Sequence, residues 1–268
     1  MLIFSVLPES APHHRSPAPG ERVVAIIPAR YQSTRLPGKP LVEIGGRPMI
    51  EHVYRRASQA RCVGEVLVAT DSPQVADAVR AFGGRAEMTS ATHQSGSDRI
   101  AEVAARLDAT IVVNVQGDEP LIAPAAIDAA IAPLLADRAV KIATLARRID
   151  READYRDQAA VKVVVRLDGR ALYFSRSSVP CVRGSAAPVA DAVIRKHIGL
   201  YVYRRETLLS FARLEPTPLE RAEALEQLRA LEHGIDIVVV DTDYDSIGVD
   251  TPEDLERVRR LFAAAPRG

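Results

Sequence analysis

The sequence predicts an α/β protein built on a mainly parallel β-sheet. Strand-like and helix-like segments alternate through the first half of the chain, which is the pattern of repeated strand–helix–strand units. The first strand-like segment is continuously apolar, as a strand buried on both faces requires. After about residue 138 the expected strands follow one another with few helices between them. Mixed or antiparallel strands are therefore expected to extend the sheet in the second half.

The first half begins with a buried strand at Val23, in the run VVAIIP, followed by a polar loop over 29–40. After a Gly-Gly turn, Pro48 occupies the first position of an expected helix, where its missing N–H costs little. The other elements expected here are a strand at 65–70, a helix opened by Ser72 and Pro73, a helix at about 97–107 and a strand at 111–115.

The second half is expected to hold four strands before a long helix. These strands lie in KIATLARRI, AVKVVVRL, ALYFS and KHIGLYVY, and they belong to a looser, mixed-strand region at about 139–234. A helix from Leu219 to His233, the strand IDIVVVD and a helix from Thr251 complete the chain.

Two of these segments carry polar residues beside buried ones. In KHIGLYVY, the residues that alternate onto one face of the strand are His197, Gly199, Tyr201 and Tyr203. Such a face can bind polyols, or it can be a half-exposed sheet face with a satisfied histidine. In the long helix, Glu226 and Gln227 lie beside the leucines of the buried stripe, so they can be site residues or surface polar groups.

Composition and charge exclude several classes of protein. An apolar fraction of 47% over 268 residues supplies a sizeable core, which excludes a disordered or fibrous chain. Because 35 basic residues balance 35 acidic ones, no overall positive field attracts nucleic acid. No apolar run reaches the ~18 residues that span a membrane. Cys62 and Cys181 lie far apart, in no redox or metal-ligand spacing, which is typical of a cytoplasmic protein.

The chain is expected to be one domain preceded by a tail. Residues 1–22 are rich in proline and lack the basic start of an export signal, so a flexible tail is expected there. The domain is expected to cover residues 23–268.

The loop ARYQSTRLPGKP, at 29–40, collects positive charge at the carboxyl end of the first strand. Arg30, Arg35 and Lys39 stand there among small residues whose backbone N–H groups are accessible. In open α/β sheets this edge is where ligands bind, and such a loop suits a triphosphate. The loop lacks the spacing of a P-loop or of a dinucleotide-binding motif. A solvated basic loop is the alternative.

Two aspartates are candidate metal ligands. Asp118, in NVQGDEP, follows the strand at 111–115 and so lies at the same edge as the basic loop, although a turn aspartate bonding its own backbone is the alternative. Asp250 precedes Thr251 and Asp254, which form a reciprocal capping pair for the last helix and leave Asp250 unused as a cap. One or two carboxylates, with phosphate oxygens and water, are enough to hold Mg²⁺.

Short motifs from Val23 to about Leu261 resemble those of the 3-deoxy-manno-octulosonate cytidylyltransferases, also called CMP-Kdo synthetases. The motifs are IPARYQSTRLPGKPL, ATD, HQSGSDR, VNVQGDEP, ALYFSR, KHIGLYVY, PLERAEALEQLR and GVDTPEDLERVR. Their number and order make the resemblance specific, whereas SxRLPxKP alone is shared with related nucleotidyltransferases. The resemblance implies a three-layer nucleotidyltransferase fold in which a mixed, mainly parallel sheet is flanked by helices.

The resemblance also implies an activity and its residues. A homodimeric, Mg²⁺-dependent enzyme would transfer CMP from CTP to 3-deoxy-manno-octulosonate (Kdo), releasing pyrophosphate and giving CMP-Kdo for lipopolysaccharide biosynthesis. The residues that match nucleotide-binding positions are Arg30, Ser33, Arg35, Lys39, Gln94, Ser95 and Arg99. Those that match positions around the sugar are Gln116, Arg176, His197, Tyr201, Glu226 and Gln227. The implied catalytic residues are Arg35, Lys39, Asp118 and Asp250, with the two aspartates as metal ligands.

Other activities stay open at this point. A related transferase could charge sialic acid or a sugar 1-phosphate, and a non-catalytic module could simply bind a nucleotide. HQSGSDR, YFSR and HIGLYVY argue against the first, and the presence of both Asp118 and Asp250 argues against the second. The segment SSVPCVRGSAAPVAD after Arg176 matches no family motif, so that side of the pocket is undefined. Kdo and its 8-amino analogue are not distinguished.

Overall fold

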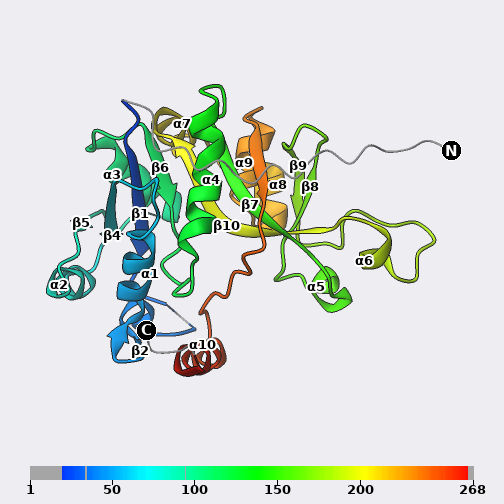
Figure 1. Cartoon of the computed structure of the whole chain (residues 1–268). Helices are drawn as coiled ribbons and strands as arrows, with labels where there is room; N and C mark the ends of the chain where they lie inside the picture. The colour runs from blue at the N-terminus through cyan, green and yellow to red at the C-terminus, as the bar shows by residue number, and fades with distance from the viewer. Residues whose placement is uncertain (1–19, 34, 94, 265–268) are drawn as a thin grey trace.

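The computed structural model describes residues 20–33, 35–93 and 95–264 of the chain (Figure 1). Its strands are β1 (Val23–Ala29), β2 (Glu43–Ile44), β3 (Arg47–Pro48), β4 (Glu65–Thr70), β5 (Ala86–Met88), β6 (Ile111–Asn114), β7 (Ile142–Arg148), β8 (Lys162–Val165), β9 (Ala171–Ser175), β10 (Arg195–Arg204) and β11 (Ile237–Asp241). Its helices are α1 (Met49–Ala57), α2 (Pro73–Ala81), α3 (Gly96–Ala105), α4 (Pro124–Ala136), α5 (Glu152–Arg156), α6 (Pro188–Asp191), α7 (Arg205–Phe211), α8 (Pro218–Glu223), α9 (Gln227–Glu232) and α10 (Pro252–Ala264), with a 3₁₀ turn, η1, at Lys39–Leu41.

The first half of the chain forms a parallel sheet in the order β5-β4-β1-β6. Its central strand, β1, is an apolar run in which Ala25, Ile26 and Ile27 are fully buried. The register aligns Ala29 of β1 with Thr70 of β4, so both strands end at the same edge. The predicted strand–helix–strand units are therefore confirmed.

The second half continues the same sheet with mixed strands, as expected. β10 runs antiparallel between β6 and β7, and β11 pairs parallel with β7. β8 and β9 form an antiparallel hairpin that joins β10 through β8. Figure 1 shows β8, β9, α5 and α6 extending to one side of the sheet. These four elements lie within residues 139–234, where the sequence predicted looser, mixed strands.

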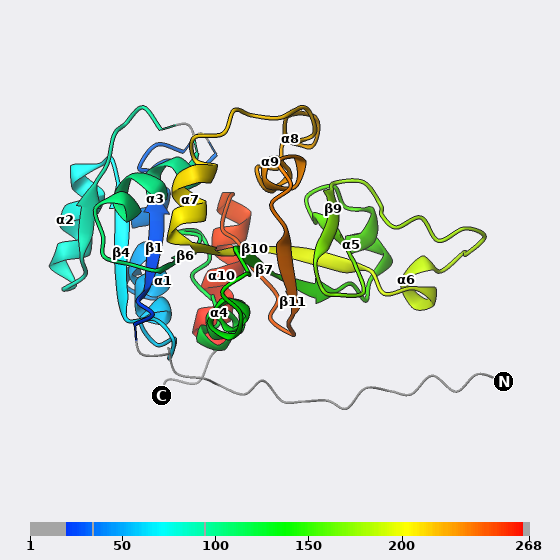
Figure 2. The same ribbon diagram turned by 90° about the horizontal axis from the view of Figure 1, so that it is seen from above.

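Helices cover both faces of the sheet and make three layers. Buried residues of α1, α2 and α4 pack on one face, and those of α3, α7 and α9 pack on the other. Figure 2 shows α3 and α7 on one side of the sheet and α4 on the other. α10 instead packs through Leu255 and Val258 against Ile44 and Met49, and Figure 1 shows it beside β2. The predicted three-layer α/β architecture is confirmed.

Two predicted helix boundaries are wrong. The long helix expected from Leu219 to His233 is two short helices, α8 and α9, separated by Ala224 in the left-handed conformation at φ 51°. The Arg176 guanidinium donates to the carbonyls of Glu223 and Ala224, which a continuous helix would need for its own bonds. This tertiary contact overrides helix propensity. Pro48 is the residue before α1, and not its first residue.

The boundary of the expected N-terminal tail lies slightly earlier than Val23. Residues 1–19 of that tail are outside the described residues. Glu21 accepts hydrogen bonds from Arg204 and Thr110, and the Arg22 backbone N–H donates to Thr110. These contacts attach residues 21 and 22 to the domain.

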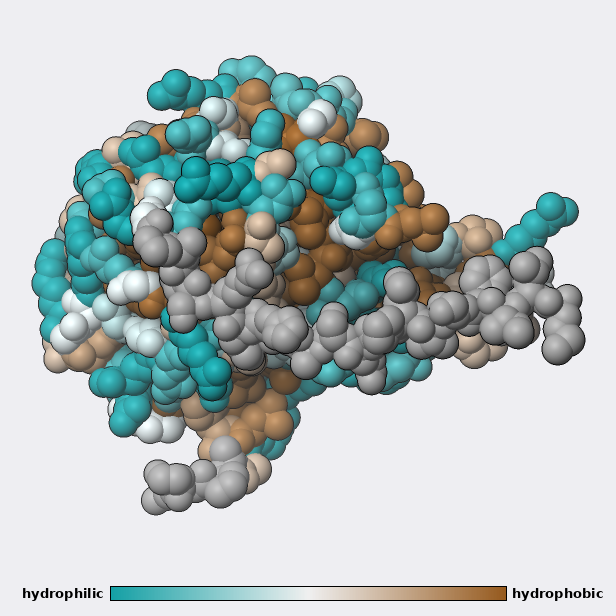
Figure 3. Space-filling view, turned by 45° about the horizontal axis from the view of Figure 1, so that its top comes forward, coloured by the Kyte–Doolittle hydropathy of each residue, from teal (hydrophilic) through white to brown (hydrophobic). Residues whose placement is uncertain are grey.

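The described part of the chain has no helix long and apolar enough to cross a membrane. The face shown in Figure 3 is a mixture of hydrophilic and hydrophobic residues. Several large apolar side chains are exposed on or beside the β8–β9 extension, namely Leu167, Leu172, Val193 and Leu219.

Candidate active site

A cleft of about 370 Å³ lies at the carboxyl end of β1. It is formed where three segments far apart in the sequence meet: the loop after β1, the turn after β6 and the segment that leads to α10. The residues that line it are Pro28, Ala29, Arg30, Gln32, Ser33, Arg35, Lys39, Pro40, Gln116, Gly117, Asp118 and Asp250. The structure therefore brings together the basic loop and both aspartates, as the sequence predicted.

Lys39 is the centre of this cleft. Its Nζ donates to Oδ2 of Asp118 at 2.6 Å and to Oδ1 of Asp250 at 2.8 Å. Arg35 Nη2 lies 3.1 Å from the same Asp250 oxygen. Burial alone would lower the pKa of Lys39, but the two carboxylates outweigh it and raise that pKa. For Asp250 burial would raise the pKa, and the bonds from Lys39 and Arg35 lower it instead.

The two carboxylates fit a magnesium site completed by a nucleotide. Both reach one cation within hydrogen-bonding distance, so their oxygens converge on one point. Among residues 20–33, 35–93 and 95–264, no group of three or more His, Cys, Asp or Glu side chains could hold a metal. Mg²⁺ is commonly bound by one or two carboxylates with substrate phosphates and water. Asp118 and Asp250 are the two carboxylates that would hold Mg²⁺ here.

Local structure explains why the Asp250 carboxylate is not needed to cap α10. The Asp254 backbone N–H donates to Thr251 Oγ1 at 3.2 Å, and the Thr251 backbone N–H donates to Asp254 Oδ2 at 3.0 Å. This is the predicted capping pair of α10. The Asp250 carboxylate is not used as a cap and points instead to Lys39 and Arg35.

The loop residues Arg30 and Ser33 lie between this cleft and a second cavity of about 470 Å³. Arg30 Nη2 donates to the His93 carbonyl at 2.6 Å, which ties the basic loop to the segment before α3. Ser33 Oγ accepts the Leu36 backbone N–H at 3.3 Å. Asp71, at the carboxyl end of β4, also lines the second cavity. Sequence reasoning missed Asp71 as a site residue, although its position after a buried parallel strand was a usable signal.

At α3, the predicted nucleotide-side residues that the structure describes are bonded within the domain. Ser95 caps α3 by accepting the Asp98 backbone N–H, and Gln94 lies outside the described residues. Arg99 is fully buried and donates to Asp71 Oδ2 at 3.0 Å and to the Thr89 hydroxyl. Arg99 therefore reaches the second cavity through Asp71, and its own guanidinium is enclosed in protein.

On the β10 side, three predicted sugar-side residues lie close together. Gln116 lines the cleft and packs beside Gly199. The His197 and Tyr201 rings are 5.3 Å apart, which confirms that they share a face of β10. His197 Nε2 is 2.9 Å from the Thr144 hydroxyl, and burial lowers the pKa of His197 to about 3. The imidazole is therefore neutral at physiological pH.

The remaining sugar-side candidates come from the α8–α9 junction and the end of β9. Glu226 Oε2 accepts the Ser97 hydroxyl at 2.8 Å, and burial raises the pKa of Glu226. Gln227 is buried at the start of α9. Arg176 donates to the carbonyls of Glu223, Gln158 and Ala224 at 2.8, 3.2 and 3.3 Å. These bonds use three of the five N–H groups of its guanidinium.

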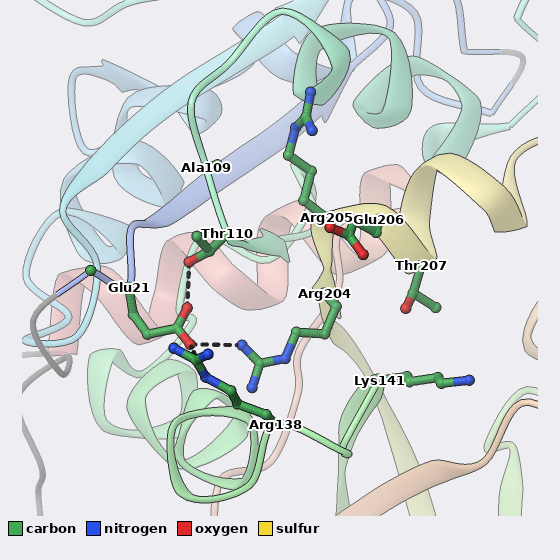
Figure 4. Close-up of a pocket in the computed structure, with 10 residues that line it drawn as sticks. Glu21, Ala109, Thr110, Arg138, Lys141, Arg204, Arg205, Glu206 and Thr207 are labelled. Atoms are coloured by element: carbon green, nitrogen blue, oxygen red, sulfur yellow. Dashed lines mark hydrogen bonds and ion pairs between the residues drawn. The ribbon is translucent and has the colours of Figure 1, made fainter.

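A larger cavity, of about 480 Å³, lies at the opposite edge of the sheet, where β1 and β6 begin (Figure 4). Although Arg138, Lys141, Arg204 and Arg205 line it, Arg204 is bonded to the Glu21 carboxylate and Arg205 to backbone carbonyls. Its two acids do not converge on one cation as those of the cleft do. The smaller cleft beside Lys39 is therefore the better candidate for catalysis.

Comparisons with known proteins identify the family of this chain. The family model for cytidylyltransferases matches residues 24–237. A 3-deoxy-manno-octulosonate cytidylyltransferase of Geobacter metallireducens is 59% identical over 88% of this chain and 96% of its own. The one of Solibacter usitatus is 52% identical over 91% of this chain and 96% of its own.

Solved structures are also similar to this chain. One of CMP:2-keto-3-deoxy-manno-octonic acid synthetase complexed with CTP has a TM-score of 0.86 and 46% identity, covering 91% of this chain and 99% of that one. A 4-diphosphocytidyl-2C-methyl-D-erythritol synthase of Anaerococcus prevotii, at 14% identity and a TM-score of 0.59, shares the fold alone. The chain belongs to the 3-deoxy-manno-octulosonate cytidylyltransferase family and is a nucleotidyltransferase.

Proposed function

We propose that this protein transfers CMP from CTP to Kdo, releasing pyrophosphate and giving CMP-Kdo for lipopolysaccharide biosynthesis in the cytoplasm. The observation that carries the proposal is the meeting of Asp118 and Asp250 on the Lys39 ammonium, beside Arg35 and at the carboxyl edge of the parallel strands. The substrates, CTP and Kdo, are inferred from the names of the relatives, which are CMP-Kdo synthetases.

The reaction requires positioning and charge neutralisation more than covalent chemistry. The anomeric hydroxyl of Kdo attacks the α-phosphorus of CTP in line, and the new P–O bond forms as the hydroxyl proton passes to water. The bond from the α-phosphorus to the bridging oxygen breaks, and pyrophosphate leaves. Arg30, Arg35 and Lys39 supply three positive charges from one loop to hold the triphosphate. When bound by Asp118 and Asp250, Mg²⁺ supplies Lewis-acid polarisation of phosphate oxygens.

On the acceptor side, Gln116, His197 and Tyr201 are proposed to bind the hydroxyl groups of Kdo, with Arg176, Glu226 and Gln227 around the rest of the acid sugar. His197 does this as a neutral ring, because its pKa of about 3 leaves it a weak base. It is thus a hydrogen-bonding group here, and not the general base. The two N–H groups that Arg176 keeps after binding three carbonyls are proposed to receive the Kdo carboxylate.

The proposed active form is a homodimer. Leu167, Leu172 and Val193 are exposed on the extension formed by β8, β9 and the segment before β10. Contact with the same region of a second copy would remove this apolar surface from water. Sedimentation of the wild type and of Leu172→Asp tests this, and a monomeric wild type would contradict the dimer.

One assay tests the function directly. The protein is incubated with CTP, Mg²⁺ and one acceptor at a time, and pyrophosphate is measured. Release with Kdo and little release with sialic acid or sugar 1-phosphates is expected, and parallel reactions with 8-amino-Kdo compare the two closest acceptors. Release with sialic acid in place of Kdo would identify the related transferase, and CTP binding without release would identify a non-catalytic module.

A further inference from the structure

Residues 242–250, which follow β11, carry Asp250 into the candidate active site without a helix or strand of their own. The Val249 backbone N–H donates to the Asp118 carbonyl at 2.9 Å, which joins the segment to the turn after β6. Because the segment has no regular backbone ladder, its position depends on contacts of this kind and on side chains.

The Glu119 side chain supplies two such contacts. Glu119 follows Asp118 directly and is only 6% exposed. Its Oε1 accepts the Ser246 hydroxyl at 2.6 Å, and its Oε2 accepts the Tyr244 hydroxyl at 3.1 Å. Both oxygens of one buried carboxylate are therefore bonded to the segment that ends in Asp250.

Burying the Glu119 carboxylate carries a free-energy cost that burying an apolar side chain does not. Removing the carboxylate from water costs free energy that hydrogen bonds only offset, and a well-packed apolar side chain would avoid the cost. What an apolar side chain could not do is bond two hydroxyls in a fixed geometry. Between those hydroxyls, Asp245 pairs with Lys196 on β10 and Arg147 on β7, so the segment is also tied to the sheet.

We propose that Glu119 is a positioning residue of the active site, which holds Tyr244 and Ser246 so that Asp250 faces Asp118. It acts through the two aspartates and does not itself touch the nucleotide. The inference rests on the proposed function, since it treats Asp118 and Asp250 as one metal site. Groups that orient metal ligands typically change metal affinity by about 10- to 100-fold when removed.

Mg²⁺-dependent binding of CTP, measured by calorimetry without acid sugar, tests this without turnover. Glu119→Ala is expected to raise the Mg²⁺ concentration for half-maximal binding by about 10- to 100-fold. The double variant Tyr244→Phe, Ser246→Ala should raise this Mg²⁺ concentration by the same factor. Adding Glu119→Ala to that double variant should add little, because all three changes remove the same contact. CTP affinity at saturating Mg²⁺ should stay close to wild type.

Asp128→Asn is a matched control. Asp128 is also a buried carboxylate, and it accepts the backbone N–H groups of Arg61 and Cys62 away from the cleft. It should lower the melting temperature and leave the Mg²⁺ midpoint unchanged. An equal shift in this control, or variants of Glu119 that melt earlier with a wild-type midpoint, would overturn the inference.

Tyr244→Phe alone keeps the test decisive if Glu119→Ala does not fold, because it preserves the aromatic packing and removes one donor. Its midpoint should rise, and an unchanged midpoint would overturn the inference. A wild type whose CTP binding is independent of Mg²⁺ would contradict the proposed metal site itself, and the inference with it. A Mg²⁺-dependent wild type with unaffected variants overturns the inference alone.

Discussion

Replacing Lys39 by Met should separate its two effects, on the metal ligands and on the nucleotide. In the structure its ammonium is bonded to both Asp118 and Asp250, at 2.6 and 2.8 Å. A metal ion that enters without a nucleotide must displace this ammonium from the carboxylates. Two unit charges about 4 Å apart gain about 4 kcal/mol at an effective dielectric of 20 and about 1 kcal/mol in water.

The solvent exposure of the two carboxylates decides where the interaction energy lies between these limits. The side chains of Asp118 and Asp250 are 31% and 46% exposed. Because solvent screens the charges, displacing the Lys39 ammonium from these carboxylates costs a metal ion about 1–2 kcal/mol. Lys39→Met should therefore tighten Mn²⁺ binding to the nucleotide-free protein by about 5- to 30-fold. The same change should weaken CTP binding at saturating Mg²⁺ by about 10- to 150-fold, because a charge-assisted hydrogen bond worth about 1.5–3 kcal/mol is lost.

Electron paramagnetic resonance of free Mn²⁺ measures the first effect, and calorimetric CTP titration measures the second. Lys141→Met, the same substitution at the opposite edge of the sheet, is the control and should change neither. If Lys39→Met left Mn²⁺ affinity unchanged, the ammonium would not occupy the metal position, and the reasoning from the two bonds would fail.

Three further predictions concern the other site residues. Asp118→Ala and Asp250→Ala should each abolish pyrophosphate release while circular dichroism shows a folded protein, and a normal Mg²⁺ dependence in either would remove that residue from the metal site. Arg176→Ala should lower kcat/KM for Kdo by about 10- to 150-fold and also the melting temperature, since it frees carbonyls at the α8–α9 break. A lower melting temperature with unchanged Kdo kinetics would leave Arg176 a purely structural role. For His197, the unfolded ring binds a proton near pH 6.5 and the folded ring only near pH 3, so stability is lost as the pH falls. Between pH 7 and 5 this one ring costs about 2 kcal/mol, so the free energy of unfolding measured by chemical denaturation should fall by about that much more in the wild type than in His197→Asn.

The sequence predicted the fold where local pattern and tertiary structure agree. The apolar run of β1 and the capping pair Thr251 and Asp254 each have a local cause, so both could be found from sequence alone. The break at Ala224 could not, because it depends on Arg176, which lies far away in the chain.

The same distinction holds at the site. Asp118 and Asp250 could be nominated from their positions after a strand and before a helix. Their meeting on the Lys39 ammonium could not, because it depends on how three distant segments pack. The proposed role of Glu119 was missed because its side chain has no local pattern that distinguishes it from an ordinary turn acid, whereas Asp71 follows a buried parallel strand and could have been noted from the sequence.

The direction of β10 has a consequence for how two substrates would be aligned. β10 is antiparallel to β6, and Tyr201 pairs with Asn114, the last residue of β6. The first residues of β10, including His197, therefore lie beyond the carboxyl end of β6, at the edge where Asp118 stands. The strand that carries His197 and the turn that carries Asp118 are thus both attached to the β6–β10 ladder. Main-chain bonds within one sheet therefore fix the position of His197 relative to the turn that carries Asp118.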